Sequence, residues 1–551
     1  MPSVDTACAI LSSLDALGVT HVLYCPGSRS APFAYALEAG SFGGDARPIL
    51  DERGAGFAAV GLARAGALPA IVVTSGTAVA ELAPAVLEAS HARLPLLVLS
   101  ADRPGELRGV GASQATRQSG FFGTHVRASL DLEPQEASPS LVGHLTRAVA
   151  AACGAPSGTP GPVQINVAFR DPLTPVSPSP GDEAGASFAP RPTRVIAASP
   201  VPARWEDVVG PADAGLIVVG EGASPRAREW SEASGFPLLA EPASGAWKDG
   251  GVVPFEQSLV CSSLGREVDA VVVTGRPTLS RPIQALLARP DVRVVVVDPH
   301  APWVDVSGNA SAVVADLEPA REPIRAAQAE WAARVREAAR DAGERIESLL
   351  DSGSGHTMLD LARIVAASTS GPLVLGASNP VRAFDLAVPS LEGRVVHSNR
   401  GQAGIDGTIA TAVGICLGSG YADEASAASD ERVTAVMGDL TACHDASSLA
   451  LAASTGAHLD IVVADDHGGG IFATLEHGRA TSPEAYDRWF GLAQSVDYEA
   501  LAAAYGVAFA RAGEPRELED LLDRPVRGPR LIHAPVERAE DLYRAIRDVL
   551  S

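Results

Sequence analysis

Short apolar runs rich in β-branched residues alternate with longer stretches of alanine and leucine along most of the chain. Runs such as "AIVVTS" (70–75) and "GLIVVG" (215–220) are apolar at nearly every position and not only at every second one. Strands of this kind are buried on both faces, as in a parallel sheet that helices cover. The pattern predicts strands at 21–25, 70–75, 95–100, 162–167, 215–220, 270–275, 292–298, 371–376, 433–439 and 459–466.

Two breaks divide these alternating elements. Residues 171–204 are rich in proline, serine, alanine and glycine and have no helical periodicity, and a helical stretch over 320–350 ends in "LLDSGSGH" (349–356). A chain of 551 residues is also too long for one hydrophobic core. The sequence therefore predicts an α/β protein with three doubly wound parallel-sheet domains at 1–180, 190–345 and 355–551.

The formal net charge of −23 argues against a nucleic acid or an anionic membrane as partner. The chain has no apolar run of 18 residues, and its N-terminus lacks the pattern of a signal peptide. Its six cysteines are scattered without a CxxC pair, which suits a reducing cytosol. We expect a cytoplasmic protein that acts on small molecules.

Asp439 and Asp466 end two successive predicted strands, with one predicted helix between them. Both strand ends would meet at the same edge of a parallel sheet, where two carboxylates and backbone carbonyls could hold Mg²⁺ together with a diphosphate. The spacing alone leaves open that the two residues only form turns and helix caps. Asp465 is an alternative ligand, although the count from Asp439 favours Asp466.

The run "HGGG" (467–470) is also found in the oxyanion hole of some esterases. Such enzymes need a G-x-S-x-G nucleophile turn, which the chain lacks. The glycines therefore more readily indicate a close approach of backbone to phosphate.

The stretch "DERGAGFAAVGLARAG" (51–66) begins like a helix with an acidic first turn. Acidic residues favour a helix N-terminus, so Glu52 could simply cap the helix. A junction before a helix in an α/β protein is also where catalytic side chains lie. The local pattern leaves both interpretations of Glu52 open.

The pairing of Gly438-Asp439 with Asp465-Asp466 resembles the diphosphate-binding motif of thiamine diphosphate enzymes. The ordered motifs resemble one branch of that superfamily, the 2-succinyl-5-enolpyruvyl-6-hydroxy-3-cyclohexene-1-carboxylate synthases of menaquinone biosynthesis. These motifs are "YCPGSRSAPFAYAL" (24–37), "DERGAGFAAVGLARA" (51–65), "TSGTAVAELAPAVLEA" (74–89), "SADRPGELRGVGASQATRQ" (100–118), "GPVQINVAFRDPL" (161–173), "SNPVR" (378–382), "SNRGQAGIDGTIATA" (398–412) and "GGGIF" (468–472).

The resemblance implies a thiamine-diphosphate-binding fold, with thiamine diphosphate and Mg²⁺ or Mn²⁺ as cofactors. It implies a carbon–carbon bond-forming transferase that decarboxylates 2-oxoglutarate and adds the succinyl carbanion in 1,4-fashion to isochorismate. Glu52 would hydrogen-bond N1′ of the cofactor's aminopyrimidine ring, and Gln114 would lie near the reacting centre. Two alternatives remain, another 2-oxoacid carboligase similar to acetolactate synthase, or a nucleotide- or flavin-binding protein without catalysis.

Both implied substrates are dianions, and arginine binds carboxylates through two parallel hydrogen bonds. The matched motif positions imply substrate contacts from Ser28, Arg29, Arg103, Arg117, Ser378, Arg382 and Arg400, with Arg281 as a weaker candidate. They imply cofactor contacts from Glu52, Gly76, Ile405, Asp439, Asp466, Gly468, Gly469, Ile471 and Phe472, with metal ligation by Asp439, Asp466 and the Gly468 carbonyl. Ile405 would be the aliphatic wedge beneath the cofactor.

The resemblance also implies a homodimer or homotetramer. The cofactor would lie between the N-terminal domain of one subunit and the C-terminal domain of the next. His467, inside a cofactor motif, receives no role, and neither does the central domain.

Overall fold

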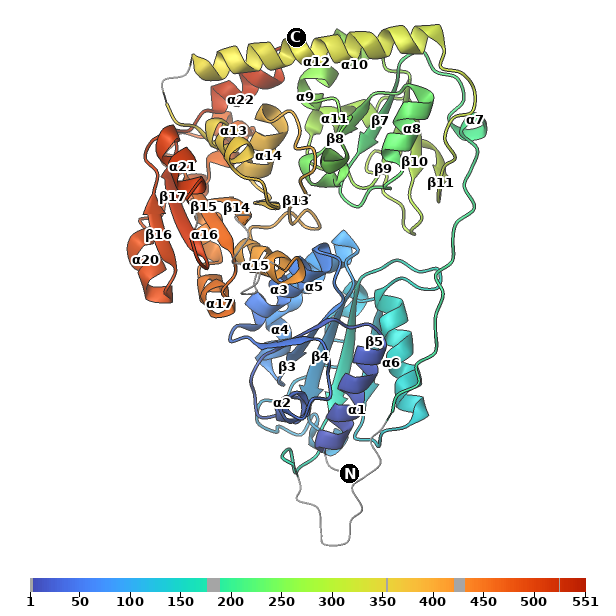
Figure 1. Ribbon diagram of the computed structural model, residues 1–551, viewed down its shortest axis with the longest axis vertical. Helices are drawn as coiled ribbons and strands as arrows, with labels where there is room; N and C mark the ends of the chain where they lie inside the picture. The colour runs from blue at the N-terminus through green and yellow to red at the C-terminus, as the bar shows by residue number, and fades with distance from the viewer. Residues whose placement is uncertain (1–2, 176–188, 353–354, 421–431, 525) are drawn as a thin grey trace. The chain divides into compact units, whose positions relative to one another are not determined.

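The computed structural model describes residues 3–175, 189–352, 355–420, 432–524 and 526–551 (Figure 1). Its strands form three sheets of six, five and six strands, and all strand pairs in these sheets are parallel. The prediction of an α/β fold with three parallel sheets is confirmed. The boundaries proposed for the three domains stay predictions, and part of the predicted linker at 171–204 lies outside the described residues.

The first sheet lies in the N-terminal third of the chain. Its order is β2 (Asp45–Pro48), β1 (His21–Tyr24), β3 (Pro69–Val73), β4 (Leu96–Asp102), β6 (Pro162–Ala168) and β5 (Ala128–Leu132). Its helices are α1 (Ser3–Ala16), α2 (Ala31–Glu38), α3 (Glu52–Arg64), α4 (Thr77–Glu81), α5 (Ala83–Ala92) and α6 (Pro139–Ala152). Buried side chains of α1, α2 and α6 form one apolar cluster with the sheet, and α3 packs beside α5.

The second sheet has the order β11 (Ala310–Val314), β10 (Arg293–Val297), β9 (Ala270–Thr274), β7 (Gly215–Val219) and β8 (Leu238–Ala240). Its helices are α7 (Trp205–Val208), α8 (Ala227–Ser234), α9 (Glu256–Cys261), α10 (Ser263–Glu267), α11 (Arg281–Leu287) and α12 (Ala326–Asp351). The long helix α12 packs against both α9 and the C-terminal helix, which also contact each other (Figure 1).

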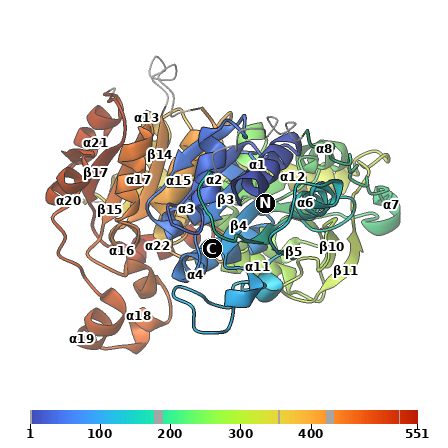
Figure 2. The same ribbon diagram turned by 90° about the horizontal axis from the view of Figure 1, so that it is seen from below.

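The third sheet has the order β13 (Val396–His397), β12 (Leu373–Leu375), β14 (Val433–Gly438), β15 (Leu459–Asp465), β17 (Arg530–Pro535) and β16 (Ala508–Arg511). The helices along this part of the chain are α13 (Met358–Ser368), α14 (Asn379–Ala387), α15 (Thr408–Gly418), α16 (Asp439–His444), α17 (Ser448–Thr455), α18 (His477–Ala480), α19 (Pro483–Tyr486), α20 (Tyr498–Tyr505), α21 (Pro515–Leu522) and α22 (Glu540–Arg547). Figure 2 shows the segment with α18 and α19 extending away from this sheet.

The first and third sheets have the same strand order. Numbered along the chain within each sheet, both read 2-1-3-4-6-5, and the second sheet reads 2-1-3-4-5. The order reverses beside the first strand in each sheet, and ligands of doubly wound folds bind at the carboxyl ends of the strands near such a reversal. Each outer sheet therefore presents one edge suited to a ligand.

All ten strands predicted from the apolar runs are present. Seven further strands were not predicted, namely β2, β5, β8, β11, β13, β16 and β17. Six of these seven are the two edge strands of the three sheets. These edge strands have two to five residues, and all of them except the buried β8 are partly exposed, so they lack the long apolar run of a central strand. The seventh, β17, is central but contains the polar residues Arg530 and His533.

Many helices begin and end at residues that satisfy the backbone. The Ser138 hydroxyl accepts a hydrogen bond from the Leu141 N–H at the start of α6, and Thr357 forms a capping box with Asp360 at the start of α13. Gly235 and Gly456 end α8 and α17 in the left-handed conformation that glycine adopts without strain. These local signals fix where the helices begin and end around the sheets.

The chain forms two compact units. The first contains Met1–Ala198 together with Ile409–Ala422 and Asp445–Ala457, so α15 and α17 belong with the first sheet. The second contains Ser199–Thr408, Asp423–His444 and His458–Ser551. In the second unit one apolar cluster runs from the second sheet to the third. The second and third sheets therefore share a core.

None of the described helices has the length and apolarity needed to span a membrane.

Two glycines permit a close crossing of α3 and α15 in the first unit. A Cβ on Gly61 would lie 2.1 Å from the carbonyl oxygen of Thr411, and a Cβ on Gly414 would lie 2.0 Å from that of Ala58. Real Cβ atoms do not approach backbone this closely, so these positions need glycine for space. The crossing packs the helix that begins at Glu52 against the core of the unit.

We predict that Gly61→Ala lowers the free energy of unfolding by about 1–3 kcal/mol, because the added methyl group forces α3 and α15 apart. Gly54→Ala on the same helix is the matched control, since its Cβ would have no neighbour closer than 3.6 Å. Alanine also favours a helix over glycine, so Gly54→Ala should be neutral or stabilising. Thermal and urea unfolding would measure both; an equal loss in the two variants would contradict the explanation.

Candidate active site

Glu52 is the first residue of α3, but it does not cap the helix. The cap is Asp51, whose Oδ1 accepts hydrogen bonds from the N–H groups of Arg53 at 2.9 Å and Gly54 at 3.2 Å. Asp51 Oδ2 also accepts a hydrogen bond of 2.9 Å from the Ser447 hydroxyl. The half-buried Glu52 carboxylate makes no hydrogen bond or ion pair with any described residue. The helix therefore does not need Glu52 as its cap.

Glu52 lies close to the carboxyl end of β1. Burial raises the pKa of the Cys25 thiol there, and the nearby negative charges of Glu52 and Asp51 raise it further. Cys25 begins the loop that carries Ser28, which is exposed, and Arg29, which is mostly buried. The structure thus gathers three predicted site residues at one edge of the first sheet.

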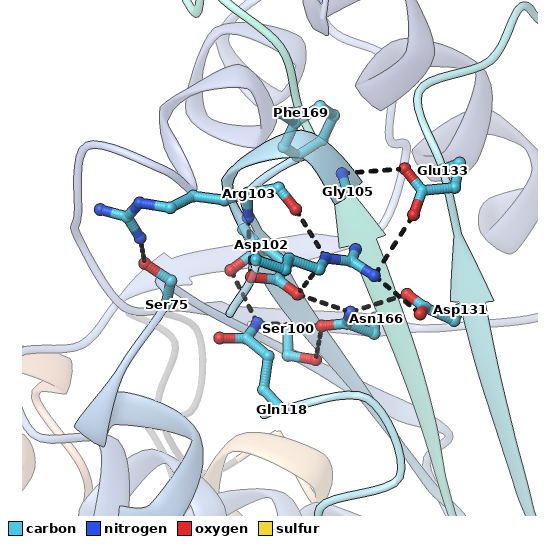
Figure 3. A network of polar contacts seen from close by, with 12 residues as sticks. Ser75, Ser100, Asp102, Arg103, Gly105, Gln118, Asp131, Glu133, Asn166 and Phe169 are labelled. Atoms are coloured by element: carbon cyan, nitrogen blue, oxygen red, sulfur yellow. Dashed lines mark hydrogen bonds and ion pairs between the residues drawn. The ribbon is translucent and has the colours of Figure 1, made fainter. Parts of the chain in front are cut away.

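Arg103 and Gln114 come together over the carboxyl ends of β3 and β4. The Arg103 guanidinium donates to the Ser75 hydroxyl at 2.7 Å (Figure 3) and to the carbonyl of Gln114 at 2.5 Å. The Gln114 amide donates to the carbonyl of Ser75 at 2.9 Å. Gly76 has a φ of +88°, and a Cβ on it would lie 2.9 Å from Gln114 Cγ. Gln114 itself has a φ of +54°, a strained conformation for a side-chain residue that is often found at functional sites.

Arg29 and Arg103 lie within each other's electrostatic field. Burial lowers the pKa of Arg29, and the charge of Arg103 lowers it further, although Asp171 acts in the opposite direction. Arg29 donates a hydrogen bond of 3.0 Å to the carbonyl of Phe169. Two neighbouring guanidinium groups at a strand edge suit an anionic ligand. Arg117 is exposed and makes no hydrogen bond or ion pair among the described residues.

A buried polar network, which sequence reasoning missed, supports this edge (Figure 3). Asp102 is 1% exposed and forms an ion pair of 3.0 Å with Arg108. The amide of Asn166 donates to Asp102 at 2.9 Å and to Asp131 at 2.8 Å, and its oxygen accepts from Gln118 at 2.9 Å. Satisfied networks of this kind make their surroundings rigid. The network anchors the loop with Arg103 and Gln114 to β4, β5 and β6.

Asp439 and Asp466 follow two adjacent strands of the third sheet. Asp439 begins α16 directly after β14, and Asp466 directly follows β15, whose Ala464 is in register with Gly438. The single helix predicted between them was wrong, because the segment breaks at Asp445 into α16 and α17. The buried Asp445 carboxylate accepts hydrogen bonds from the N–H groups of Ile409 and Ala410. The two strand ends nevertheless meet at one edge, as predicted.

The two carboxylates have the environment of a cation site. Asp439 is 2% exposed, and its Oδ2 has no hydrogen-bond partner among the described residues. Burial raises the pKa of Asp439 to about 6, with a contribution from the charge of Asp465. Burial and the charge of Asp439 raise the pKa of Asp466 to about 7. Crowded carboxylates of this kind are stabilised by a divalent cation, so these residues fit Mg²⁺.

Asp465 is engaged in other contacts. Its Oδ2 lies 2.9 Å from His533 Nε2, and its Oδ1 accepts a hydrogen bond of 3.0 Å from the N–H of His467. No described residue hydrogen-bonds or pairs with the Asp466 carboxylate. Asp466 therefore fits a metal better than Asp465. No group of three or more His, Cys, Asp or Glu side chains in the described ranges is arranged for a metal, so further ligands would be backbone or cofactor oxygens.

The glycine run after Asp466 leaves no room for side chains. A Cβ would lie 2.0 Å from the carbonyl of Gly491 at Gly468, 2.3 Å from that of Phe490 at Gly469, and 2.1 Å from Asp466 Oδ2 at Gly470. Gly468 has a φ of +122°, and its carbonyl, the predicted third metal ligand, accepts a hydrogen bond of 3.0 Å from the N–H of Gly470. Such a backbone turn can approach a diphosphate closely.

The other two predicted cofactor contacts of this run follow it directly. Ile471 and Phe472 lie in the 3₁₀ turn Gly470–Thr474, where Ile471 is half-buried and Phe472 is 37% exposed. Ile405, the predicted wedge, is half-buried in the loop before α15. All three present apolar surface that a ligand could cover.

Arg382 and Arg400 are neighbours in the second unit. Arg382 donates to the carbonyls of Ala377 at 3.1 Å and Ser378 at 2.7 Å, and Arg400 donates to the same Ala377 carbonyl at 3.3 Å. Arg400 is 6% exposed, and its Nε has no partner among the described residues. Burial lowers the pKa of Arg382 to about 10, and the charge of Arg400 contributes. Neither forms an ion pair with a described carboxylate, so the pair fits an anion.

The acids nearest to this pair are deeply buried. Burial raises the pKa of Glu241 to about 8 and that of Asp385 to about 6, and it raises the pKa of Glu256 well above its usual range. A carboxyl group whose pKa lies near 8 is mostly neutral at neutral pH, so Glu241 does not cancel the charge of the arginines, whereas Asp385 stays largely ionised beside them. Arg281, the weaker candidate, is 74% exposed and pairs with Glu476 at 3.5 Å on the surface.

The structure thus assembles two groups of predicted site residues, one at the carboxyl edge of the first sheet and one in the second unit. Their individual roles stay predictions. Comparison with known proteins gives the context of this arrangement. The N-terminal thiamine pyrophosphate-binding domain of thiamine pyrophosphate enzymes matches residues 4–121, and the C-terminal thiamine pyrophosphate-binding domain of these enzymes matches residues 383–534. The chain is a thiamine pyrophosphate enzyme.

Full-length relatives specify the family further. Proteins named 2-succinyl-5-enolpyruvyl-6-hydroxy-3-cyclohexene-1-carboxylate synthase from Kineococcus radiotolerans and Nocardioides sp. are 42% and 40% identical to the chain, over 98% of it and 96% and 97% of their own lengths. The protein of the same name from Mycobacterium avium is 38% identical over 100% of both chains. The chain belongs to the family of 2-succinyl-5-enolpyruvyl-6-hydroxy-3-cyclohexene-1-carboxylate synthases.

We predict that Asp51→Ala lowers the free energy of unfolding by about 0.5–2 kcal/mol, because two N–H groups of α3 lose their cap. Glu52→Gln should leave the free energy of unfolding unchanged, since the Glu52 carboxylate makes no hydrogen bond or ion pair with a described residue. Thermal unfolding of the two variants beside the wild type would measure this difference. A larger loss for Glu52→Gln than for Asp51→Ala would instead make Glu52 a structural residue.

Proposed function

We propose that the protein decarboxylates 2-oxoglutarate and joins the remaining succinyl fragment in 1,4-fashion to isochorismate. The product would be 2-succinyl-5-enolpyruvyl-6-hydroxy-3-cyclohexene-1-carboxylate of menaquinone biosynthesis. Membership of the family supports this reaction. The structural observation that carries it is the pair of the half-buried Arg382 and the buried Arg400, neither of which forms an ion pair with a described carboxylate. Two neighbouring arginines without an ion-pair partner suit an anion, and both substrates are dianions.

Thiamine diphosphate, when bound, supplies the nucleophilic carbon that a decarboxylation of a 2-oxoacid requires. Glu52 would accept or share a proton at N1′ of its aminopyrimidine ring, and the absence of any other described partner for this carboxylate supports the role. Gln114, held by Ser75 and strained in its backbone, would orient a substrate near the reacting carbon. Gly76 at the adjacent turn would leave space for the cofactor ring.

Asp439 and Asp466 would hold Mg²⁺ or Mn²⁺, and the Gly468 carbonyl would complete the protein ligands. The unpartnered Asp439 Oδ2 and the raised pKa values of both carboxyl groups support this site. The glycine run 468–470 would let backbone approach the diphosphate. Ile405 would support the cofactor from below, while Ile471 and Phe472 would border the substrate.

The substrate carboxylates would be bound by two groups of residues. Arg29, Arg103 and Arg117 with Ser28 form one group at the first sheet, and Arg382 and Arg400 with Ser378 form the other. We also propose a homodimer or homotetramer in which residues of the N-terminal and C-terminal domains of different subunits share one cofactor. All six cysteines are free thiols, which supports action in the cytoplasm.

The decisive experiment follows the ultraviolet absorbance of isochorismate. We predict that its consumption needs the protein, 2-oxoglutarate, thiamine diphosphate and Mg²⁺ together. Glu52→Gln should lower kcat by about 10²- to 10⁴-fold, because it loses the group that exchanges a proton with the cofactor. The variant should keep its fold. Turnover of pyruvate alone, without consumption of isochorismate, would instead indicate an enzyme similar to acetolactate synthase.

A second prediction concerns the metal. Asp466→Ala should weaken the Mg²⁺-dependent binding of thiamine diphosphate by about tenfold or more, since a direct ligand is lost. Asp466→Asn should weaken it less, because an amide oxygen can still bind Mg²⁺. Asp487→Asn is the matched control, since it removes a carboxylate that lines the same cavity as Asp466. Calorimetry with Mg²⁺ and with a chelator would measure binding; unchanged binding in Asp466→Ala would exclude it as a ligand.

A further inference from the structure

The buried guanidinium of Arg400 is held from outside its own domain. Arg400 lies in the loop after β13 of the third sheet, and its NH2 nitrogen donates a hydrogen bond of 3.1 Å to the hydroxyl of Thr278. Its backbone carbonyl accepts a hydrogen bond of 3.0 Å from the guanidinium of Arg276. Thr278 and Arg276 both lie in the loop 275–280, which connects β9 to α11 of the second sheet. One loop of the central domain therefore contacts both the side chain and the backbone of Arg400.

Arg276 is itself fixed by a neighbouring strand end. Its guanidinium forms an ion pair of 2.8 Å with Glu221, which follows β7, and the exposed fractions of the two side chains are 13% and 8%. The N–H of Arg276 also donates to the carbonyl of Glu221 at 2.9 Å. The ion pair and the backbone hydrogen bond together hold Arg276 in place, because separating two buried charges is costly.

Glycines bring the two loops together. A Cβ on Gly220 would lie 2.1 Å from the backbone carbon of Arg276, and a Cβ on Gly275 would lie 2.4 Å from the carbonyl oxygen of Gly220. The loop is held again three residues on from Arg276, where the N–H of Leu279 donates to the Glu241 carboxyl group at 2.5 Å. Thr278 thus lies between two anchored positions.

The partners of the Arg400 side chain are all neutral. They are the Ala377 carbonyl and the Thr278 hydroxyl, and Arg400 Nε stays unpaired in the described part of the chain. The Glu221 carboxylate of the central domain pairs with Arg276 and not with Arg400. The central domain therefore orients Arg400 without neutralising it. This arrangement leaves the charge of Arg400 for a ligand.

We propose that Arg276, Thr278 and Glu221 are positioning residues, through which the central domain aims Arg400 at a substrate carboxylate. The inference rests on the proposed function, in which Arg400 binds one of the two dianionic substrates. It gives the central domain a part in substrate binding. Arg276 and Thr278 act through Arg400, so their loss should weaken substrate binding more than it slows the chemical step.

Two variants test the proposal. Thr278→Val removes the hydroxyl at nearly constant volume, and the double variant Glu221→Gln/Arg276→Gln removes the ion pair without leaving a lone buried charge. We expect each to raise the KM of one of the two substrates about tenfold, since a hydrogen bond to a charged group is lost or misplaced. kcat should stay within about threefold and thiamine diphosphate affinity within about twofold. The single variant Arg276→Lys keeps a positive charge and a hydrogen-bond donor, so its KM should rise less than that of the double variant.

A matched control removes another ion pair of the central domain. Arg226 and Asp316 form an ion pair of 2.9 Å, and neither residue contacts Arg400. The double variant Asp316→Asn/Arg226→Gln should therefore leave both KM values unchanged. A double-mutant cycle between Arg400 and Thr278 tests whether Thr278 acts through Arg400 or only stabilises the fold. In an Arg400→Gln background, Thr278→Val should change KM less than about twofold, because the residue it positions is gone.

Calorimetry of 2-oxoglutarate and isochorismate binding to the same proteins distinguishes a failure of the proposed function from a failure of the inference on Arg400. A wild type that binds a substrate but does not turn it over contradicts the proposed function, while weaker binding in the Thr278 and Arg276 variants still supports the inference. Unchanged binding in these variants, or effects that add fully to Arg400→Gln, would overturn it. A wild type that binds neither substrate would overturn both.

Discussion

Parallel pairing of strands is the constraint on which the rest of this structure depends. Because all strands of a sheet run the same way, every loop that follows a strand lies at the same edge. Residues as distant in sequence as Cys25, Ser75 and Arg103 therefore meet at one edge of the first sheet. Asp439 and Asp466 meet in the same way at the third sheet. The identical strand order of these two sheets gives the chain two comparable ligand edges.

The arginines of the candidate site have the opposite sign to the net charge of the chain. The chain has a net charge of −23, yet the half-buried Arg382 and the buried Arg400 form no ion pair with a carboxylate in the described residues. Burial raises the pKa of the neighbouring Glu241 to about 8, so this acid is mostly neutral at neutral pH. Desolvated charges are costly when unpaired, and a protein keeps them where a ligand supplies the opposite charge. The crowded carboxylates at Asp439 and Asp466 present the same situation with the opposite sign.

The sequence predicted the centres of the sheets better than their edges. Nearly every central strand has a run that is apolar at most positions, because both of its faces are covered; β6 also buries Gln164 and Asn166 within its run, and β17 lacks such a run. The edge strands β2, β5, β8, β11, β13 and β16 have one neighbour and mixed faces, so no periodicity marks them. β17 was not predicted for another reason: its first residue, the buried Arg530, pairs with Asp460 at 2.8 Å, and His533 interrupts its apolar run. A charge with a buried partner cannot be told from an exposed one in a single sequence.

The sequence by itself determined the α/β class, the three parallel sheets and the ordered motifs that resemble the family. These follow from local composition and from residue types at fixed spacing. The tertiary structure decided which acidic residue of α3 is the cap, because Asp51 and Glu52 have the same local pattern and differ only in their contacts. It also decided that Asp465 pairs with His533 while Asp466 stays available. The contacts of Arg400 with Arg276 and Thr278 join residues more than 100 positions apart, and only packing of the two sheets in one core brings them together.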